Sequence, residues 1–134
     1  HRVQLQCLKD WGERCETVAW GRLDSGGSTR LGAVLRHAAV LCTRGMRRHG
    51  LETCTVLLLT DGELHDIDVH DSRYLAADLL QALRELRARG IRVQALLPTP
   101  SPLLRRALGT SAYRSLGADP WGPALAQALS ARAG

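Results

Sequence analysis

Two long segments of the chain repeat apolar residues every three or four positions, which is the spacing of an amphipathic helix. The first extends from Thr29 to about Arg48. Its apolar positions are Leu31, Val34, Leu35, Ala38, Leu41 and Cys42. Ser28 or Thr29 is available as the N-cap, because a hydroxyl oxygen accepts hydrogen bonds from the first free N–H groups of a helix. The pattern therefore predicts a helix over residues 29–48.

The second helical segment extends from about Ser72 to Arg89. Its inner stripe consists of Leu75, Leu79, Leu83 and Leu86. Asp71 precedes this segment in position for an N-cap, and Gly90 follows it, where a glycine commonly ends a helix. These signals at both ends predict a helix with bounds close to residues 72 and 89.

Three further segments have the patterns of strands. Residues 3–9 (VQLQCLK) alternate apolar and polar side chains, which predicts a strand exposed on one face. Residues 53–60 (TCTVLLLT) do not alternate, so we expect both faces of this strand to be buried, as in a central parallel strand. Residues 91–98 form another strand that ends at a proline. Shorter patterns predict a helix at 101–108, a strand near 112–116 and a terminal helix at about 120–132.

The order of these elements predicts an α/β fold with a mostly parallel, Rossmann-like sheet flanked by helices, because strands and helices alternate along the chain. A length of 134 residues fits one domain, so residues 1–134 are interpreted as a single domain. In parallel sheets of this kind, ligands bind at the carboxyl ends of the strands. Asp61 directly follows the strand at 53–60 and is therefore a candidate site residue.

The composition argues against several classes of protein. No stretch approaches the roughly 20 apolar residues of a membrane-spanning helix, and the N-terminal residues lack the apolar segment of a signal peptide. The four cysteines show no C-x-x-C pair, which favours a cytoplasmic chain without disulfides. The net charge of +5 resides almost wholly on arginine, without the interleaved aromatic residues typical of nucleic-acid binding. We expect no nucleic-acid partner and no membrane insertion, whereas an acidic protein partner fits the charge.

Five carboxylates lie within eleven positions after the strand at 53–60: Asp61, Glu63, Asp66, Asp68 and Asp71. Hard cations such as Mg²⁺ take oxygen ligands, and one or two carboxylates with a hydroxyl suffice. Asp61 supplies a carboxylate at the strand end, Gly62 allows a sharp turn, and the hydroxyl of Thr29 begins the preceding helix at the same edge. Thr29 and Asp61 are the candidate metal ligands. The alternatives, a turn aspartate and an ordinary N-cap threonine, stay open on these residues alone.

The segment GGSTRLGAVLRHA (26–38), followed by TVLLLTDGE (55–63), resembles the von Willebrand factor A domain. The resemblance implies a metal-ion-dependent adhesion site built from three loops, of which the second carries a threonine and the third an aspartate. Thr29 matches the second and Asp61 the third, whereas nothing matches the D-x-S-x-S motif of the first. The resemblance further implies that the first strand and first helix are missing from this sequence, so metal binding is expected to be weak.

A longer match is with the C-terminal A domain of the NorD and CbbO proteins. It is carried over residues 3–97 by LKDW, STRLGAVLRHA and LTDGELHDIDVHDSRYLAADLLQALRELRARGI. This resemblance implies an adaptor that links a MoxR-type AAA+ ATPase to a client enzyme, either rubisco (CbbO-like) or nitric oxide reductase (NorD-like). It also implies a bound Mg²⁺, or Mn²⁺ or Ca²⁺ in its place, and a client that presents an acidic side chain. The residues implied at the rim or in partner contact are Ser28, Arg30, Gly62, Glu63, Asp66 and Asp68.

Two other functions are weighed against the adaptor. A Mg²⁺-dependent hydrolase or phosphoryl-transfer enzyme also uses clustered carboxylates. The chain has no glycine-rich phosphate loop, no G-K-S/T and no nucleophile elbow, which argues against that chemistry. A scaffold fragment that binds no metal is the third possibility, because the first motif is missing. We therefore expect a binding module rather than an enzyme.

Overall fold

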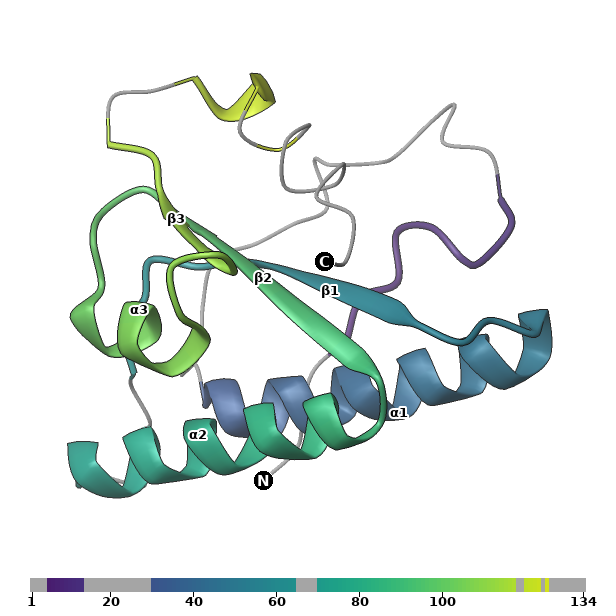
Figure 1. Cartoon of the computed structure of the whole chain (residues 1–134), viewed down its shortest axis with the longest axis horizontal. Helices are drawn as coiled ribbons and strands as arrows, with labels where there is room; N and C mark the ends of the chain where they lie inside the picture. The colour runs from purple at the N-terminus through teal and green to yellow at the C-terminus, as the bar shows by residue number, and fades with distance from the viewer. Residues whose placement is uncertain (1–4, 14–29, 65–69, 118–119, 124, 126–134) are drawn as a thin grey trace.

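The structure is a computed structural model that describes residues 5–13, 30–64, 70–117, 120–123 and 125. Helices and strands alternate along the chain in these residues (Figure 1). Their order and bounds are α1 (Leu31–His49), β1 (Cys54–Leu59), α2 (Ser72–Ala88), β2 (Ile91–Leu97), α3 (Pro102–Leu108) and β3 (Tyr113–Ser115). The alternation confirms the predicted α/β fold.

The three strands form one parallel sheet in the order β1-β2-β3. Val56 of β1 pairs with Val93 of β2, and Leu97 of β2 pairs with Ser115 of β3. Parallel neighbours need a crossover connection, and the connections that contain α2 and α3 supply the two crossovers. Because all three strands run the same way, the loops that follow them meet at one edge of the sheet.

Helices α1 and α2 lie side by side along one face of the sheet and bury the main core there (Figure 1). Members of this core from α1, β1, α2 and α3 include Leu35, Leu58, Leu79 and Leu104. Three of the four leucines predicted as the inner stripe of α2 are buried, and the fourth, Leu83, is partly buried against the same core. The helical periodicity therefore identified the buried face of α2 correctly.

The opposite face of β1 is more exposed than the sequence pattern predicted. Leu58 belongs to the main core and is 9% exposed, whereas its neighbour Leu59 is 57% exposed. Successive side chains of a strand point to opposite faces, and α1, α2 and α3 contribute their buried residues to the core on only one of them. On the other face, a small cluster of Leu96 and Leu116 packs with Leu57 and Leu125. The prediction that both faces of residues 53–60 are buried was therefore wrong.

The two long helices begin in different ways. Asp71 caps α2 as predicted, because its Oδ1 atom accepts hydrogen bonds from the N–H groups of Arg73 (2.9 Å) and Tyr74 (3.4 Å). The N-cap of α1 is Arg30, which makes no side-chain capping bond. Ser28 and Thr29, the residues predicted as a hydroxyl cap, lie outside the described residues. Of the terminal helix predicted at 120–132, residues 120–123 and 125 are described, and all of these except residue 120 are helical.

Residues 5–9 do not form the strand predicted at 3–9. Leu5 is 57% exposed, and in the described part of the chain the sheet contains only β1, β2 and β3. The alternating pattern fails here because a strand needs a neighbour for its backbone hydrogen bonds. Further along this segment, Trp11 packs on α1. Its ring stacks on His49 with 5.9 Å between the ring centroids, and a Cβ added at Gly45 would lie 2.6 Å from the indole.

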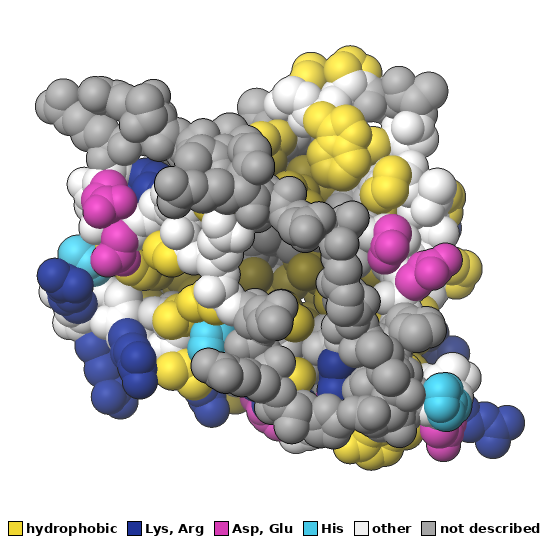
Figure 2. Space-filling model, turned by 180° about the vertical axis from the view of Figure 1, so that it is seen from behind, with side chains coloured by type: hydrophobic (Ala, Val, Ile, Leu, Met, Phe, Trp, Pro, Cys, Tyr) yellow, Lys and Arg dark blue, Asp and Glu magenta, His cyan; other side chains and the backbone are white. Residues whose placement is uncertain are grey.

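Part of the positive charge gathers where α1 ends. The last turn of this helix contains Arg47, Arg48 and His49, and Figure 2 shows dark blue side chains clustered at that end of the molecule. Cations are favourable at a helix C-terminus because they face the negative end of the helix dipole. This placement supports the interpretation of the arginines as solvated helix surface. Among the helices that the structure describes, none has the length and apolar character needed to cross a membrane.

Candidate functional site

The loop that follows β1 is folded back on itself at Thr60 and Asp61. The Oδ1 atom of the exposed Asp61 side chain accepts a hydrogen bond from the N–H of Glu63 (3.0 Å). The hydroxyl of Thr60 accepts one from the N–H of Gly62 (3.1 Å). Short polar side chains commonly close turns in this way. Asp61 therefore acts as a turn aspartate at the carboxyl end of β1, with its carboxylate at the surface.

Gly62 fits this loop against the loop that follows β2. Its φ of 85° lies in the left-handed region, which glycine adopts without strain. A Cβ at this position would lie 2.6 Å from Cδ2 of Leu97 and 2.7 Å from Cβ of Ser101. The carbonyl of Gly62 also accepts a hydrogen bond from the hydroxyl of Ser101 (3.4 Å), which is 8% exposed and caps α3. The two loops are thus in contact at a position that has no room for a side chain.

The turn that follows β1 contains three side chains with oxygen atoms that could bind a cation. They are the exposed carboxylates of Asp61 and Glu63 and the hydroxyl of Thr60, which lies 3.5 Å from Oδ1 of Asp61. Within the ranges that the structure describes, no three or more His, Cys, Asp or Glu residues are grouped so that they could hold a metal ion. Oxygen donors are the type that Mg²⁺ takes, and water commonly completes its coordination. The donor chemistry at this edge fits Mg²⁺, whereas the number of protein ligands is small.

Four of the predicted site residues lie outside the described residues: Ser28, Thr29, Asp66 and Asp68. The structure brings Asp61, Gly62 and Glu63 together in one turn. The predicted pairing of Thr29 with Asp61 at a metal ion stays a prediction, and so does any partner contact through the acidic loop.

Arg30, which was predicted at the site rim, makes several contacts with α2. Its Nη2 atom donates a hydrogen bond to the hydroxyl of Tyr74 (2.9 Å), and its guanidinium carbon lies 5.4 Å from the centroid of that ring. Its Nε atom is 3.4 Å from Oδ2 of Asp78. Burial lowers the pKa of Arg30, but the hydrogen bonds and charges of Asp78 and Tyr74 outweigh this effect, and the pKa is raised. These contacts join the start of α1 to α2, and a role of Arg30 in recognition stays a prediction.

Asp78 is the centre of an ionic network between α1 and α2. Its side chain is 11% exposed, and Oδ1 accepts a hydrogen bond from Nη1 of Arg36 (2.7 Å). The Nε atom of Arg36 also donates to Oε2 of Glu85 (3.0 Å). The hydrogen bond to Asp78 is the main reason why the pKa of Arg36 is raised, since burial alone would lower it. A charge-assisted bond of this length fixes the position of one helix against the other.

Gly32 allows the two helices to approach closely at this network. A Cβ at Gly32 would clash with the carboxylate of Asp78 and would lie 3.1 Å from its backbone oxygen. Sequence reasoning missed this arrangement, although one signal was present. Asp78 and Glu85 each follow an apolar residue of the inner face, Leu75 and Ala82, by three positions. A carboxylate at that spacing lies beside the buried stripe, where it requires a partner.

Comparison with known proteins adds evidence that the geometry alone does not provide. No protein-family model and no solved structure matches the chain. The chain is 34% identical over 97 residues to protein NorD of Brucella abortus and 33% identical over 93 residues to protein NorD of Stutzerimonas stutzeri. The chain is NorD-like over most of its length. An uncharacterized protein of Pseudomonas aeruginosa is 37% identical over 94 residues.

The similarity to NorD covers a small part of the relatives. The matched segments are 70% of this chain but 15% of the Brucella protein, and 67% of this chain but 14% of the Stutzerimonas protein. The chain therefore spans about one seventh of the length of the NorD proteins that it matches. The activity and partners of a whole NorD protein come to this chain only as proposals, and the resemblance to the von Willebrand factor A domain stays a prediction.

Proposed function

We propose that this chain is a protein-binding adaptor segment and that a divalent cation at the carboxyl edge of the sheet takes part in binding the client. Asp61 is the observation that carries the proposal. It is an exposed carboxylate at the carboxyl end of a parallel strand, in a chain that is 34% identical to NorD over 97 residues. Oδ1 of Asp61 closes the turn through Glu63, so Oδ2 is the atom that remains for a cation.

The residues proposed to hold Mg²⁺ are Asp61 and Thr29, with water in the other positions. Mg²⁺ would supply an open coordination position for an acidic side chain of the client. The turn at Gly62 and its contact with Ser101 hold the Asp61 backbone, so the carboxylate is presented without a change of fold. Because Mn²⁺ and Ca²⁺ also take oxygen ligands, either is an alternative occupant.

The proposed partners are those that the sequence resemblance to the NorD and CbbO proteins implies. They are a MoxR-type AAA+ ATPase as the motor and nitric oxide reductase as the client, with rubisco as the alternative client of a CbbO-like protein. The chain is proposed to couple the two rather than to catalyse a reaction. The phosphate loops and nucleophile elbows of the enzymes considered above are absent from the sequence, which supports this choice.

Two substitutions at one position separate the metal function from the turn function. Asp61→Asn keeps an oxygen that accepts from the N–H of Glu63 but loses the charge that a cation needs, whereas Asp61→Ala loses both. The full chain and both variants are immobilised and incubated with native lysate in Mg²⁺ or in EDTA, and retained proteins are identified by mass spectrometry. The proposal expects an AAA+ ATPase and one client with the unaltered chain in Mg²⁺, and loss of the client in EDTA and with both variants.

The control is Glu52→Ala, which removes an exposed carboxylate just before β1, where the strand begins. This variant should retain the client. If Asp61→Asn binds the client as well as the unaltered chain, and EDTA has no effect, Asp61 is only a turn residue. That result would favour the scaffold that binds no metal and would end the metal-dependent proposal.

A further inference from the structure

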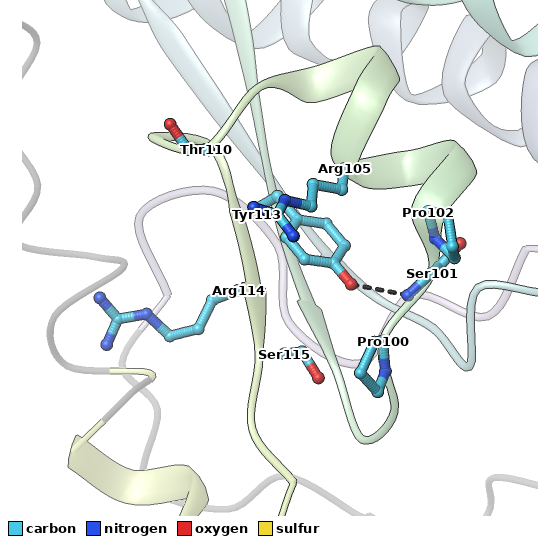
Figure 3. A pocket seen from close by; sticks show the side chains of 8 residues that line it. All are labelled: Pro100, Ser101, Pro102, Arg105, Thr110, Tyr113, Arg114 and Ser115. Carbon is cyan, nitrogen blue, oxygen red and sulfur yellow. Dashed lines mark hydrogen bonds between the residues drawn. The ribbon is translucent and has the colours of Figure 1, made fainter.

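A groove of about 530 Å³ lies between α3 and β3 (Figure 3). Its walls include Pro100, Ser101, Pro102, Arg105, Tyr113 and Ser115. The volume is in the range of pockets that bind ligands, which is roughly 300–1,000 Å³. Ser101 belongs both to this groove and to the contact with Gly62, whereas Asp61 does not line the groove. The groove is therefore a neighbour of the proposed metal edge and not a part of it.

Tyr113 is held in the groove by a short hydrogen bond. Its hydroxyl oxygen accepts from the N–H of Ser101 at 2.6 Å, which is the dashed line in Figure 3. A phenol both accepts and donates, so the O–H hydrogen of Tyr113 is available for a ligand. The strand places Tyr113 and Ser115 on the same side of β3, while Arg114 points to the other side (Figure 3). The hydroxyl groups of the strand are thus directed into the groove.

The charge of the groove favours an anion. Arg105 lines it from α3, and none of the residues that line this described groove is acidic. A guanidinium group matches a carboxylate because its N–H groups form paired, charge-assisted hydrogen bonds. Pro100 and Pro102 add apolar walls that carry no N–H group. A ligand that combines a carboxylate with an apolar part meets both features.

We propose that this groove binds a short acidic peptide segment of a partner protein, with a glutamate or aspartate carboxylate at Arg105 and Tyr113 and an apolar neighbour against Pro100 and Pro102. This inference rests on the proposed function as a protein-binding module. Binding in the groove differs from binding at the proposed metal edge in its independence from metal, because contact with a guanidinium and a phenol needs no divalent cation.

The probe is a fluorescein-labelled hexapeptide that contains two glutamate and two leucine residues, acetylated at one end and amidated at the other. Its binding to the full chain is measured by fluorescence anisotropy in EDTA. A second peptide has glutamine in place of glutamate and a free terminal carboxylate, which separates side-chain from terminal recognition. We expect the acidic peptide to bind, the Arg105→Gln variant to bind it about tenfold more weakly or worse, and added salt to weaken binding.

Arg106→Gln is the matched control, because Arg106 is the next residue of α3, is exposed and does not line the groove. It should bind the peptide as the unaltered chain does. Equal losses in Arg105→Gln and Arg106→Gln would show non-specific attraction to basic surface and would overturn the inference, as would equal binding of both peptides. Circular dichroism of each variant checks that the fold is kept.

The same assay separates this inference from the metal-dependent proposal. Asp61→Asn should leave peptide binding in EDTA unchanged if the groove is the site. If the peptide binds only with Mg²⁺ and is lost in Asp61→Asn, the metal edge is the binding site and the groove is not. If the peptide binds in EDTA while client capture ignores Mg²⁺, the groove stands and the metal-dependent proposal fails.

Discussion

Removing the charge of Asp78 tests whether the ionic network holds α1 against α2. Asp78→Asn keeps the size of the side chain and one acceptor oxygen, but it removes the negative charge that faces Arg36 at 2.7 Å. The guanidinium of Arg36 would then pair with Glu85 alone, at 3.0 Å. Because the carboxylate is only 11% exposed, water can replace its contacts only in part.

The loss of stability expected for Asp78→Asn lies between the values for exposed and for buried ion pairs. Exposed ion pairs contribute about 0–1 kcal/mol, and breaking a fully buried pair costs about 3–5 kcal/mol. Arg36 is 36% exposed, so solvent screens one partner, and we expect Asp78→Asn to lower the free energy of unfolding by roughly 1.5 kcal/mol. Glu85 also pairs with Arg36, but its side chain is 32% exposed, so Glu85→Gln should lower the free energy of unfolding by only about 0.5 kcal/mol.

Urea unfolding followed by circular dichroism measures both variants. With a slope on the order of 1.5 kcal/mol per molar urea, Asp78→Asn should lower the midpoint by about 1 M and Glu85→Gln by about 0.3 M. The double variant Asp78→Asn/Arg36→Gln should lose at least about 0.5 kcal/mol less free energy of unfolding than the sum of the two single variants, because Asp78 and Arg36 share one contact. Equal midpoints for Asp78→Asn and Glu85→Gln would refute the reasoning, and the helix contact would then depend on apolar packing.

Three further predictions concern close contacts and a buried thiol. Gly32→Ala should destabilise the chain by about 1 kcal/mol in urea, although alanine is the better helix former, because the new methyl group meets Asp78; a gain in stability would contradict the contact. Gly62→Ala should lower the free energy of unfolding by about 2 kcal/mol and the melting temperature by several degrees, because alanine is strained at φ 85° and its methyl group would meet Leu97 and Ser101. An unchanged melting temperature would contradict this contact. Burial and the Cys54 thiol raise the pKa of Cys42 to about 12. At pH 8, iodoacetamide should therefore label Cys42 much more slowly than the exposed Cys7, and equal labelling rates would contradict the burial. The urea midpoint should decrease as the pH rises above about 9, because the thiol then loses its proton in the unfolded chain but keeps it in the folded chain.

The long helices were predictable because their signals are local. The spacing of leucines along residues 72–89 places them on one face of a helix whatever surrounds it, and Asp71 meets the first N–H groups of that same helix. The turn at Gly62 is also local, since it closes through neighbouring residues. The predicted position of Asp61 at the carboxyl end of a strand is confirmed for the same reason.

The predictions that failed each depended on a partner elsewhere in the chain. Residues 5–9 have the alternation of a strand but form none, because a strand requires the backbone of a neighbour. Leu59 belongs to an unbroken apolar run and is still 57% exposed, because the described helices that form the main core lie on the other face of β1. Burial of a strand face depends on what covers it, and the strand's own sequence does not contain that information.

The sequence by itself determined the type and approximate bounds of the main elements, the parallel α/β arrangement and the aspartate at the sheet edge. The tertiary structure alone decided that Arg36 and Asp78, 42 positions apart, form an ion pair, and that α3 and β3 enclose a groove with Arg105 and Tyr113. Periodicity and capping are properties of neighbouring residues, so they can be read along the chain. A contact between two helices or across a groove depends on the relative placement of whole elements, which is set only when the core packs.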